Sequence, residues 1–387
     1  MEHELPDGWE WGKLGDVSNI VMGQSPPGDT YNETGDGTPF LQGKSEFCDV
    51  SPKHVKYTTC PNKIAPEGSV LISVRAPVGD VNVASIDYCI GRGLASVSLK
   101  DGSNKYLFYV LRYLKPKLES QGTGSTFMAI SKPTLSNLVI PLPPLDVQQK
   151  IVSILEKAEE TKRLRAQADE LTQQLLKNVF LEMFGDPVKN EKGWEMTTLG
   201  DMCTLIKDGP HVSPKYVEKG VPFITVNNII NGYFDFSNPR YISEEDHKLF
   251  CKRCRPEKGD VLYTKGGTTG FAKRIDIDIE FSIWVHLALL KFPKDSLDSI
   301  FLENCLNSDY CKAQAERYTR GIANKDLVLS QIAKISIPIP PLPLQQKFAA
   351  IVGHTERIRE HQTQSSQEIN ILFDSLMQKA FTGELIC

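Results

Sequence analysis

The spacing of apolar residues divides the chain into two kinds of segment, which alternate and then recur in the same order. Short apolar runs bounded by glycine-bearing loops predict β-strands at residues 69–74, 81–85, 261–264 and 281–292. We expect short helices over residues 105–120 and 299–318. Each group of such elements leads through a proline-rich turn into one long stretch with helical apolar spacing. The pattern predicts two mixed α/β globular regions, each followed by a long amphipathic helix.

The proline-rich turns indicate that the two halves are copies of one unit. Residues 140–150 have the sequence IPLPPLDVQQK, and residues 337–347 have IPIPPLPLQQK. Upstream, Gly8-Trp9-Glu10 with Leu14-Gly15-Asp16 is repeated as Gly193-Trp194-Glu195 with Leu199-Gly200-Asp201. A repeat of this length indicates two duplicated domains and not a solenoid. We therefore predict a first domain at residues 1–142, a helix at 143–185, a second domain at 186–340, and a second helix with a tail at 341–387.

The two long helices are expected to pair with each other. Asp146 is in a suitable place for an N-cap, with Gln149 completing a capping box, and Gly185 and Pro187 end the pattern. The helices are about 57 Å long at 1.5 Å per residue, too long for one domain face to cover their apolar stripes. Chain order makes the pairing antiparallel and brings the C-terminus near residues 1–10. The alternative is that each helix folds back on its own domain. The first predicted stripe consists of Ile151, Ile154, Leu155, Ala158, Leu164, Ala168, Leu171, Leu175 and Val179.

The second stripe has a polar middle, which predicts that its ends carry most of the apolar packing. It consists of Phe348, Ile351, Thr355, Ile358, Gln362, Ser365, Ile369, Leu372 and Leu376.

Composition sets limits on partners and location. The chain of 387 residues has 44 Lys and Arg against 48 Asp and Glu, so a DNA surface must come from the arrangement of charges and not from their excess. No apolar run is long enough to span a bilayer, and the nine cysteines form no framework. We expect a cytoplasmic protein with free thiols and no membrane partner.

The familiar motifs of catalysis and of cofactor binding are missing from the sequence. There is no Asn-Pro-Pro-Tyr-like tetrapeptide, and the loop at residues 266–270 lacks the Gly-Lys-Ser/Thr ending of a nucleotide site. His247, Cys251 and Cys254 have zinc-like spacing but no clear second pair of ligands nearby. We expect no catalytic residues, no metal and no cofactor.

The loops differ between the copies far more than the framework does. Arg75-Ala76-Pro77-Val78 stands against Gly266-Gly267-Thr268-Thr269, and Gln24-Ser25-Pro26-Pro27 stands against Asp208-Gly209-Pro210-His211. Because loops carry specificity on a shared framework, this difference predicts two different targets.

The doubled Pro-Pro-Leu-x-x-Gln-Gln-Lys turn, the Gly-Trp-x-x-x-x-Leu-Gly-Asp openings and the Gly-Asp-Val-Leu-x-x-x-x-Gly-x-x-Gly loop at residues 259–270 resemble the specificity subunit of type I DNA restriction-modification systems. The first half departs from that loop, with Ser69 in place of Asp and Arg75-Ala76 in place of the glycine pair. The resemblance implies two target-recognition domains separated by two long helices paired as an antiparallel coiled coil, with pseudo-two-fold internal symmetry.

The resemblance also implies partners. Each domain would bind one half of a bipartite target in double-stranded DNA, and the helices would space the halves and dock two methyltransferase subunits. The restriction and motor subunit would join that assembly. The alternatives are a self-contained DNA-modifying enzyme and a coiled-coil adaptor that does not bind DNA.

Loop position and side-chain chemistry select the candidate DNA contacts, since Arg and Lys suit guanine and phosphate and Asn and Gln suit adenine. For each of them a purely structural or solvent-exposed role is the alternative, and Arg92 would serve equally as an ion-pair partner at a strand end. The first-domain candidates are Gln24, Ser25, Lys44, Arg75, Arg92, Thr123, Ser125 and Lys132. The second-domain candidates are His211, Lys215, Asn227, Asn228, Lys265, Thr268, Thr269, Arg320, Asn324 and Lys325.

Overall fold

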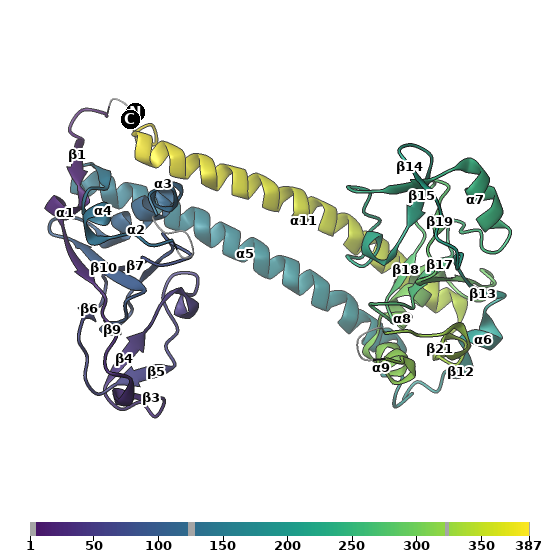
Figure 1. The fold of residues 1–387 in the computed structure, drawn as a ribbon. Coiled ribbons are helices and arrows are strands. Elements are labelled where there is room, and N and C mark those ends of the chain that lie inside the picture. The colour runs from purple at the N-terminus through teal and green to yellow at the C-terminus, as the bar shows by residue number, and fades with distance from the viewer. Residues whose placement is uncertain (1–4, 123–127, 322–324, 387) are drawn as a thin grey trace. The chain divides into compact units, whose positions relative to one another are not determined.

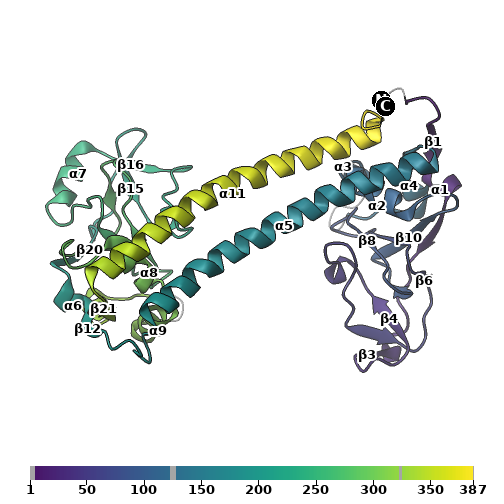
Figure 2. The same ribbon diagram turned by 180° about the vertical axis from the view of Figure 1, so that it is seen from behind.

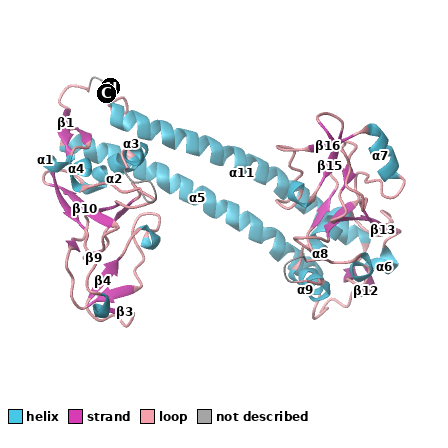
Figure 3. Ribbon diagram, viewed as in Figure 1, coloured by secondary structure: helices cyan, strands magenta, loops and turns pink. Residues whose placement is uncertain are grey.

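The computed structural model describes residues 5–122, 128–321 and 325–386, which form two compact units. Unit 1 contains residues 1–166 and 364–387, and unit 2 contains residues 167–363. Each unit therefore holds one α/β domain together with a part of each long helix (Figure 1). The long helices are α5 (Leu145–Phe184) and α11 (Leu342–Thr382). Among the described residues, strands occur only in the two α/β domains, and the long helices are continuous (Figure 3).

Unit 1 is built on a four-stranded antiparallel sheet with a second, smaller sheet beyond it. The main sheet has the order β2 (Ser18–Met22), β10 (Leu94–Leu99), β7 (Val70–Ser73) and β8 (Val81–Val83). The second sheet has the order β3 (Tyr31–Asn32), β5 (Lys56–Thr58), β4 (Thr38–Leu41), β9 (Tyr88–Ile90) and β6 (Ile64–Ala65). The pair β1 (Glu10–Lys13) and β11 (Val139–Leu142) closes the domain next to α5. The short helices are α1 (Leu14–Val17), α2 (Asn104–Tyr113), α3 (Lys115–Ser120) and α4 (Lys132–Ser136), with 3-10 turns at Gly28–Thr30 and Lys44–Glu46.

Unit 2 repeats this plan. Its main sheet has the order β13 (Leu205–Asp208), β20 (Leu287–Lys291), β17 (Val261–Thr264) and β18 (Ala272–Arg274). Its second sheet has the order β14 (Tyr216–Val217), β16 (Arg240–Ile242), β15 (Val221–Ile224) and β19 (Ser282–Ile283), and β12 (Glu195–Thr198) pairs with β21 (Ser336–Ile339). The short helices are α6 (Leu199–Met202), α7 (Glu244–Cys251), α8 (Ser299–Leu306), α9 (Asp309–Tyr318) and α10 (Leu329–Ile332), with a 3-10 turn at Val226–Asn228.

The expected elements are present, with two of them divided. The predicted helices at 105–120 and 299–318 are each two helices, and the run at 281–292 is two strands separated by a turn. That run is divided because β19 pairs with β15 in the second sheet, whereas β20 pairs with β13 and β17 in the main sheet. An apolar run alone does not tell which of two sheets a strand joins.

The two long helices pack against each other in both units, and Figure 2 shows the same pairing from behind. In unit 1 the start of α5 and the end of α11 share one core, which includes Leu155 and Met377. In unit 2 the end of α5 and the start of α11 do the same, and the rings of Phe180 and Phe348 are 5.5 Å apart. Since the start of one helix meets the end of the other, the pairing is antiparallel as predicted.

The predicted apolar stripe is correct at the start of α5 and wrong further along the helix, where Leu175 is 47% exposed and Leu176 and Phe180 are buried in its place. Ile151 and Leu155 are buried, but Leu164 is 52% exposed and Leu171 is 65% exposed. The contact there is polar instead, because Gln362 Nε2 donates to Thr172 Oγ1 at 3.0 Å. Apolar spacing does not distinguish a residue that faces the other helix from one that faces solvent.

The expected capping box at Asp146 and Gln149 is also wrong. The carbonyl of Pro144 accepts from the backbone of Val147 and Gln148, so α5 begins at Leu145, two residues earlier than the box requires. Asp146 instead pairs with Lys150.

A buried glutamine just after the proline-rich turn explains why this turn recurs in both halves. Gln148 is buried, accepts from the backbone N–H of Ser103 at 2.9 Å and donates to Pro143 O at 2.9 Å. Gln345 accepts from Asp298 N at 2.9 Å and donates to Pro340 O at 2.7 Å. Because each amide satisfies backbone groups on both sides of the turn, this buried glutamine fixes the long helix to its domain.

The two ends of the chain meet in unit 1, as expected. Leu5 lies against the same core as Leu385 and Ile386, and Pro6 lies directly against Gly383.

Candidate nucleic-acid interface

The first group of candidates in unit 1 lies where β2 ends. Gln24 N donates to Ile90 O at 2.9 Å, and the backbone N–H of Arg92 reaches Ser25 Oγ at 3.5 Å. Gly23 permits this approach, because a Cβ at that position would be 2.2 Å from Gly91 O. The structure therefore brings Gln24, Ser25 and Arg92 together, with the side chains of Gln24 and Arg92 exposed.

Arg75 forms a second group with Lys132. Arg75 follows β7, is exposed, and makes an antiparallel bridge to Ala129. Ile130 N donates to Val74 O at 3.0 Å, which holds the segment that leads into α4 and its first residue, Lys132, beside Arg75. Thr123 and Ser125 lie outside the described residues.

Lys44 has a partner within the protein. Its ammonium lies 2.6 Å from a carboxylate oxygen of Asp80, and Lys115 lies 2.6 Å from the other oxygen. Burial raises the pKa of Asp80, but the hydrogen bonds and charges of Lys115 and Lys44 outweigh it and hold the pKa below its ordinary value. Lys44 is therefore partly neutralised.

In unit 2 the candidates surround a buried carboxylate. Asp208, the last residue of β13, is 2% exposed. Its oxygens lie 2.5 Å from Arg253 Nη2, 3.3 Å from His211 Nε2 and 3.6 Å from Lys265 Nζ. Burial raises the pKa of Asp208, but the Arg253 hydrogen bond and the nearby charges of Lys265, His211 and Arg253 lower it overall.

Lys265 extends this network to a further loop. It is 6% exposed, and its ammonium lies 3.4 Å from Asp326. Asp326 exchanges two backbone hydrogen bonds of 2.9 Å with Arg320, and Gly267 N donates to Lys325 O at 3.1 Å. These bonds place Arg320 and Lys325 beside the loop after β17.

That loop presents Thr268 to solvent, while Thr269 Oγ1 lies 3.0 Å from Thr319 Oγ1. Asn324 lies outside the described residues.

The two asparagines have different environments. Asn228 Oδ1 accepts from Thr225 N at 2.9 Å, and Asn228 Nδ2 donates to Asp235 O at 3.0 Å, so its amide closes a turn of the chain. Asn227 is exposed on the same turn.

A hollow of about 620 Å³ opens between α7 and the loop after β13. Three of its lining side chains, His211, Lys215 and Arg253, are potential anion partners. Sequence reasoning missed Arg253, because it lies 45 positions from Asp208 and no local pattern marks it. The other lining residues are Pro210, Val212, Ser213, Pro214, Asp246, Leu249 and Phe250.

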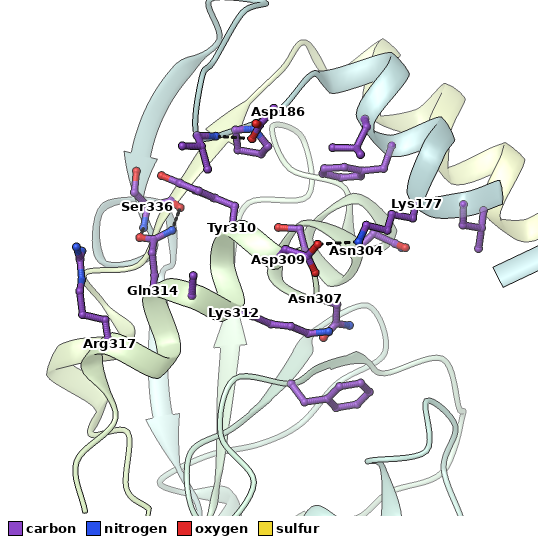
Figure 4. Close-up of a pocket in the computed structure, with 18 of the residues that line it drawn as sticks. Lys177, Asp186, Asn304, Asn307, Asp309, Tyr310, Lys312, Gln314, Arg317 and Ser336 are labelled. Atoms are coloured by element: carbon purple, nitrogen blue, oxygen red, sulfur yellow. Dashed lines mark hydrogen bonds and ion pairs between the residues drawn. The ribbon is translucent and has the colours of Figure 1, made fainter. Parts of the chain in front are cut away.

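A larger hollow of about 1390 Å³ lies in unit 2 beside α5 and α9 (Figure 4). Lys177 pairs with Asp309 at 2.7 Å across it. Gln314 exchanges two hydrogen bonds with the backbone of Ser336, which fix α9 to β21 (Figure 4). These contacts join the end of α5 and the strand β21 to α9.

Of the residues with zinc-like spacing, His247 and Cys251 are in contact, with Sγ 3.6 Å from Nε2. His247 Nδ1 lies 2.9 Å from Ser282 Oγ, and burial raises the pKa of Cys254 to about 12. In the part of the chain that the structure describes, no three His, Cys, Asp or Glu residues come together as metal ligands.

The sequence matches the family model described as type I restriction modification DNA specificity domain, once over residues 6–173 and again over residues 191–370. The MjaIX specificity subunit of Methanocaldococcus jannaschii is 26% identical over 99% of this chain and 94% of its own length. The putative MjaX specificity subunit of the same organism is 43% identical, over 46% of this chain and 42% of its own length. The solved S subunit of Mycoplasma genitalium matches the fold with a TM-score of 0.59, 18% identity and 98% coverage of both chains.

This chain belongs to the family of type I restriction-modification specificity subunits. Members of that family are recognition subunits and not catalytic ones. Among the helices of the described residues, none is both long and apolar enough to cross a membrane.

Proposed function

We propose that this chain binds double-stranded DNA at two separate short sequences, one for each α/β domain. The target-recognition domains are residues 1–142 and 186–340, and their exposed loop residues make the contacts. The observation that supports two different targets is that equivalent positions on one framework carry different chemistry. The strand register aligns Arg75 with Gly266. It also aligns Met22 with Asp208, so Ser25, and not Pro27 as in the sequence comparison, stands at the position of His211.

A domain exchange tests this proposal. Residues 1–140 would be replaced by the matching region of a relative, and the methylated sites of the complex would be sequenced. The half of the target bound by the first domain should change, and the other half should stay the same. A change in both halves would contradict the proposal.

The helices at 143–185 and 341–387 are the second part of the proposal: they dock two methyltransferase subunits. Leu175 and Leu372 occupy equivalent positions on α5 and α11 and are 47% and 57% exposed. A repeated apolar side chain on two copies of a helix suits two copies of one partner. The restriction subunit joins this assembly. The whole complex acts on DNA in the cytoplasm.

Single substitutions test the docking. Leu175→Glu and Leu372→Glu should each remove one methyltransferase subunit from the purified complex, measured as its mass by light scattering. Glu182→Gln, at an exposed polar position of α5, is the control and should leave the mass unchanged. Full assembly of both leucine variants would place the docking surface elsewhere.

Spacing is the third part, and helix length tests it. Four residues inserted after Gln167 lengthen α5 by about 6 Å, which corresponds to nearly two base pairs. The unspecified gap in the target should widen while both half-sequences stay the same. An unchanged gap with full activity would mean that the helices do not set the spacing.

The two alternative functions make different predictions. A self-contained DNA-modifying enzyme would modify DNA without partners, and a coiled-coil adaptor would select no sequence from a randomised duplex pool. A gel shift of such a pool, with and without the methyltransferase subunit, separates these outcomes from the proposed one.

A further inference from the structure

Asp208 is a buried charge that joins separate segments of the second domain. Arg253 follows α7, His211 lies in the loop after β13, and Lys265 follows β17, yet all three direct a nitrogen at this one carboxylate. Arg253 also binds the backbone, since its Nε donates to Asp208 O at 3.1 Å. The contacts connect residues up to 57 positions apart in sequence, as between Asp208 and Lys265.

Through Lys265 the connection reaches a third loop. Lys265 O accepts from Leu327 N at 2.7 Å, while its ammonium lies 3.4 Å from Asp326. The neighbouring residues Arg320 and Lys325 are candidate DNA contacts in that loop. Asp208 therefore contacts the loop after β13 and the residue after β17, and Lys265 extends the connection to Asp326 in the segment after α9.

The first domain achieves the same framework without these charges. Met22 pairs with Ala95 as Asp208 pairs with Ala288, so Met22 and Asp208 are equivalent, and Val74 is equivalent to Lys265. Met22 and Val74 belong to the apolar core. The framework thus does not require a buried ion pair at this place, although removing two charges from water is costly.

We propose that Asp208, acting with Lys265, is a positioning residue that determines the DNA specificity of the second domain without touching DNA. The buried pair fixes the relative positions of three loops, whose exposed side chains make the contacts. This inference rests on the proposed function.

The test uses the full chain assembled with its methyltransferase subunit and a randomised duplex pool. In Asp208→Asn the preference for the second half-target should fall by about tenfold or more, a loss comparable to that of one mismatched base pair. Preference for the first half-target should change by less than about twofold, because distant sites act independently. Unchanged preference for both halves would overturn the inference.

Asp260→Asn is the matched control. Asp260 is also buried in unit 2 and also has lysine partners, with Lys291 at 2.6 Å and Lys294 at 3.3 Å, but it lies at the opposite end of β17 from Lys265. This variant should keep the second half-target preference. An equal loss in both variants would show general destabilisation and would overturn the inference.

A double variant, Asp208→Met with Lys265→Val, copies the first domain and leaves neither member of the pair as an unpaired buried charge. Replacing a buried ion pair by apolar residues is often neutral for stability, so the variant should fold. It should still lose the second half-target preference, measured in the same selection. Retained preference would mean that the pair has no positioning role. If the unmodified chain selects no bipartite target at all, the proposed function itself fails, which is a different result.

Discussion

The main sheets of the two α/β domains have the same strand register, but the residues beside the recognition loops differ in chemistry. Met22 and Val74 occupy these positions in the first domain, whereas Asp208 and Lys265 occupy them in the second. The strand register on both sides is the same, so the framework accepts either pair. The difference shows that loop anchoring can change in chemistry while the sheet that carries the loops stays constant.

The joints, where the proline-rich turn connects each domain to its long helix, keep the same chemistry in both units. The buried glutamines Gln148 and Gln345 make the same kind of contacts in both units. Glu159 and Glu356 also occupy equivalent helix positions, but Arg112 of α2 binds the first and Arg274 of β18 binds the second. The position of the carboxylate is retained, and its cationic partner comes from a different element.

The largest expected effect is that of Asp208→Met, which leaves the buried Lys265 ammonium without its buried partner. Breaking such a pair costs about 3 to 5 kcal/mol, because the remaining charge is left buried. Amide hydrogen exchange in β17 should show this loss of stability. The volume-conserving change Met22→Leu at the apolar site should cost less than about 1.5 kcal/mol in β7. Equal losses would show that the two sites are energetically alike.

The glutamine joints should give the next largest effect, with equal size in both units. Gln148→Leu and Gln345→Leu each leave a backbone N–H and a carbonyl without their partner, at a cost of about 3 kcal/mol. Gln345→Leu also removes a longer donation, of 3.2 Å, to Ser296 O. Urea unfolding of each variant measures the cost. The exposed neighbours provide controls, since Gln149→Ala and Gln346→Ala should change stability by less than about 0.5 kcal/mol. Very different values for Gln148 and Gln345 would break the equivalence of the joints.

Arg75→Ala tests the exposed loop residues, which also differ between the two domains. If Arg75 binds a guanine edge, the variant should lose about 1 to 3 kcal/mol of binding and relax one position of the first half-target. The second half-target should be unaffected, because Arg75 belongs to the first domain and the proposed function assigns the second half-target to the other domain. Binding titrations with single-base variants of the target measure this. A uniform loss on all sequences would indicate a phosphate contact.

Lowering the pH should produce the smallest difference in stability between the wild type and a variant without the buried pair. The pKa of the Asp208 carboxyl is lowered, so its stabilising contribution is complete above the ordinary aspartate value and is lost as pH falls through the lowered pKa. Below about pH 4 the wild type should therefore lose more stability than the Asp208→Met, Lys265→Val variant. Urea midpoints of both proteins at neutral and acid pH provide the comparison, in which Asp80 of unit 1 contributes equally to both. Parallel losses would show that Asp208 is not stabilised in its charged form.

The sequence by itself determined the duplication, the α/β class of each domain and the two long helices. Strand runs such as 69–74, the repeated turn and the long amphipathic stretches are local patterns, and local patterns follow from the periodicity of side chains. Sequence also located the candidate loops, since Arg75 and Thr268 are exposed where the glycine-rich segments predicted loops.

Only the tertiary structure decided which side chains are buried and which face solvent. It showed Lys265 buried against Asp208, Asn228 closing a turn, Leu164 and Leu171 facing solvent, and Arg253 joining the site from another element. The physical reason is that burial and ion pairing depend on segments far apart in the chain. The sequence around a lysine does not show whether its side chain is exposed on a loop or buried in an ion pair. Only the contacts between strands and loops distinguish the two cases.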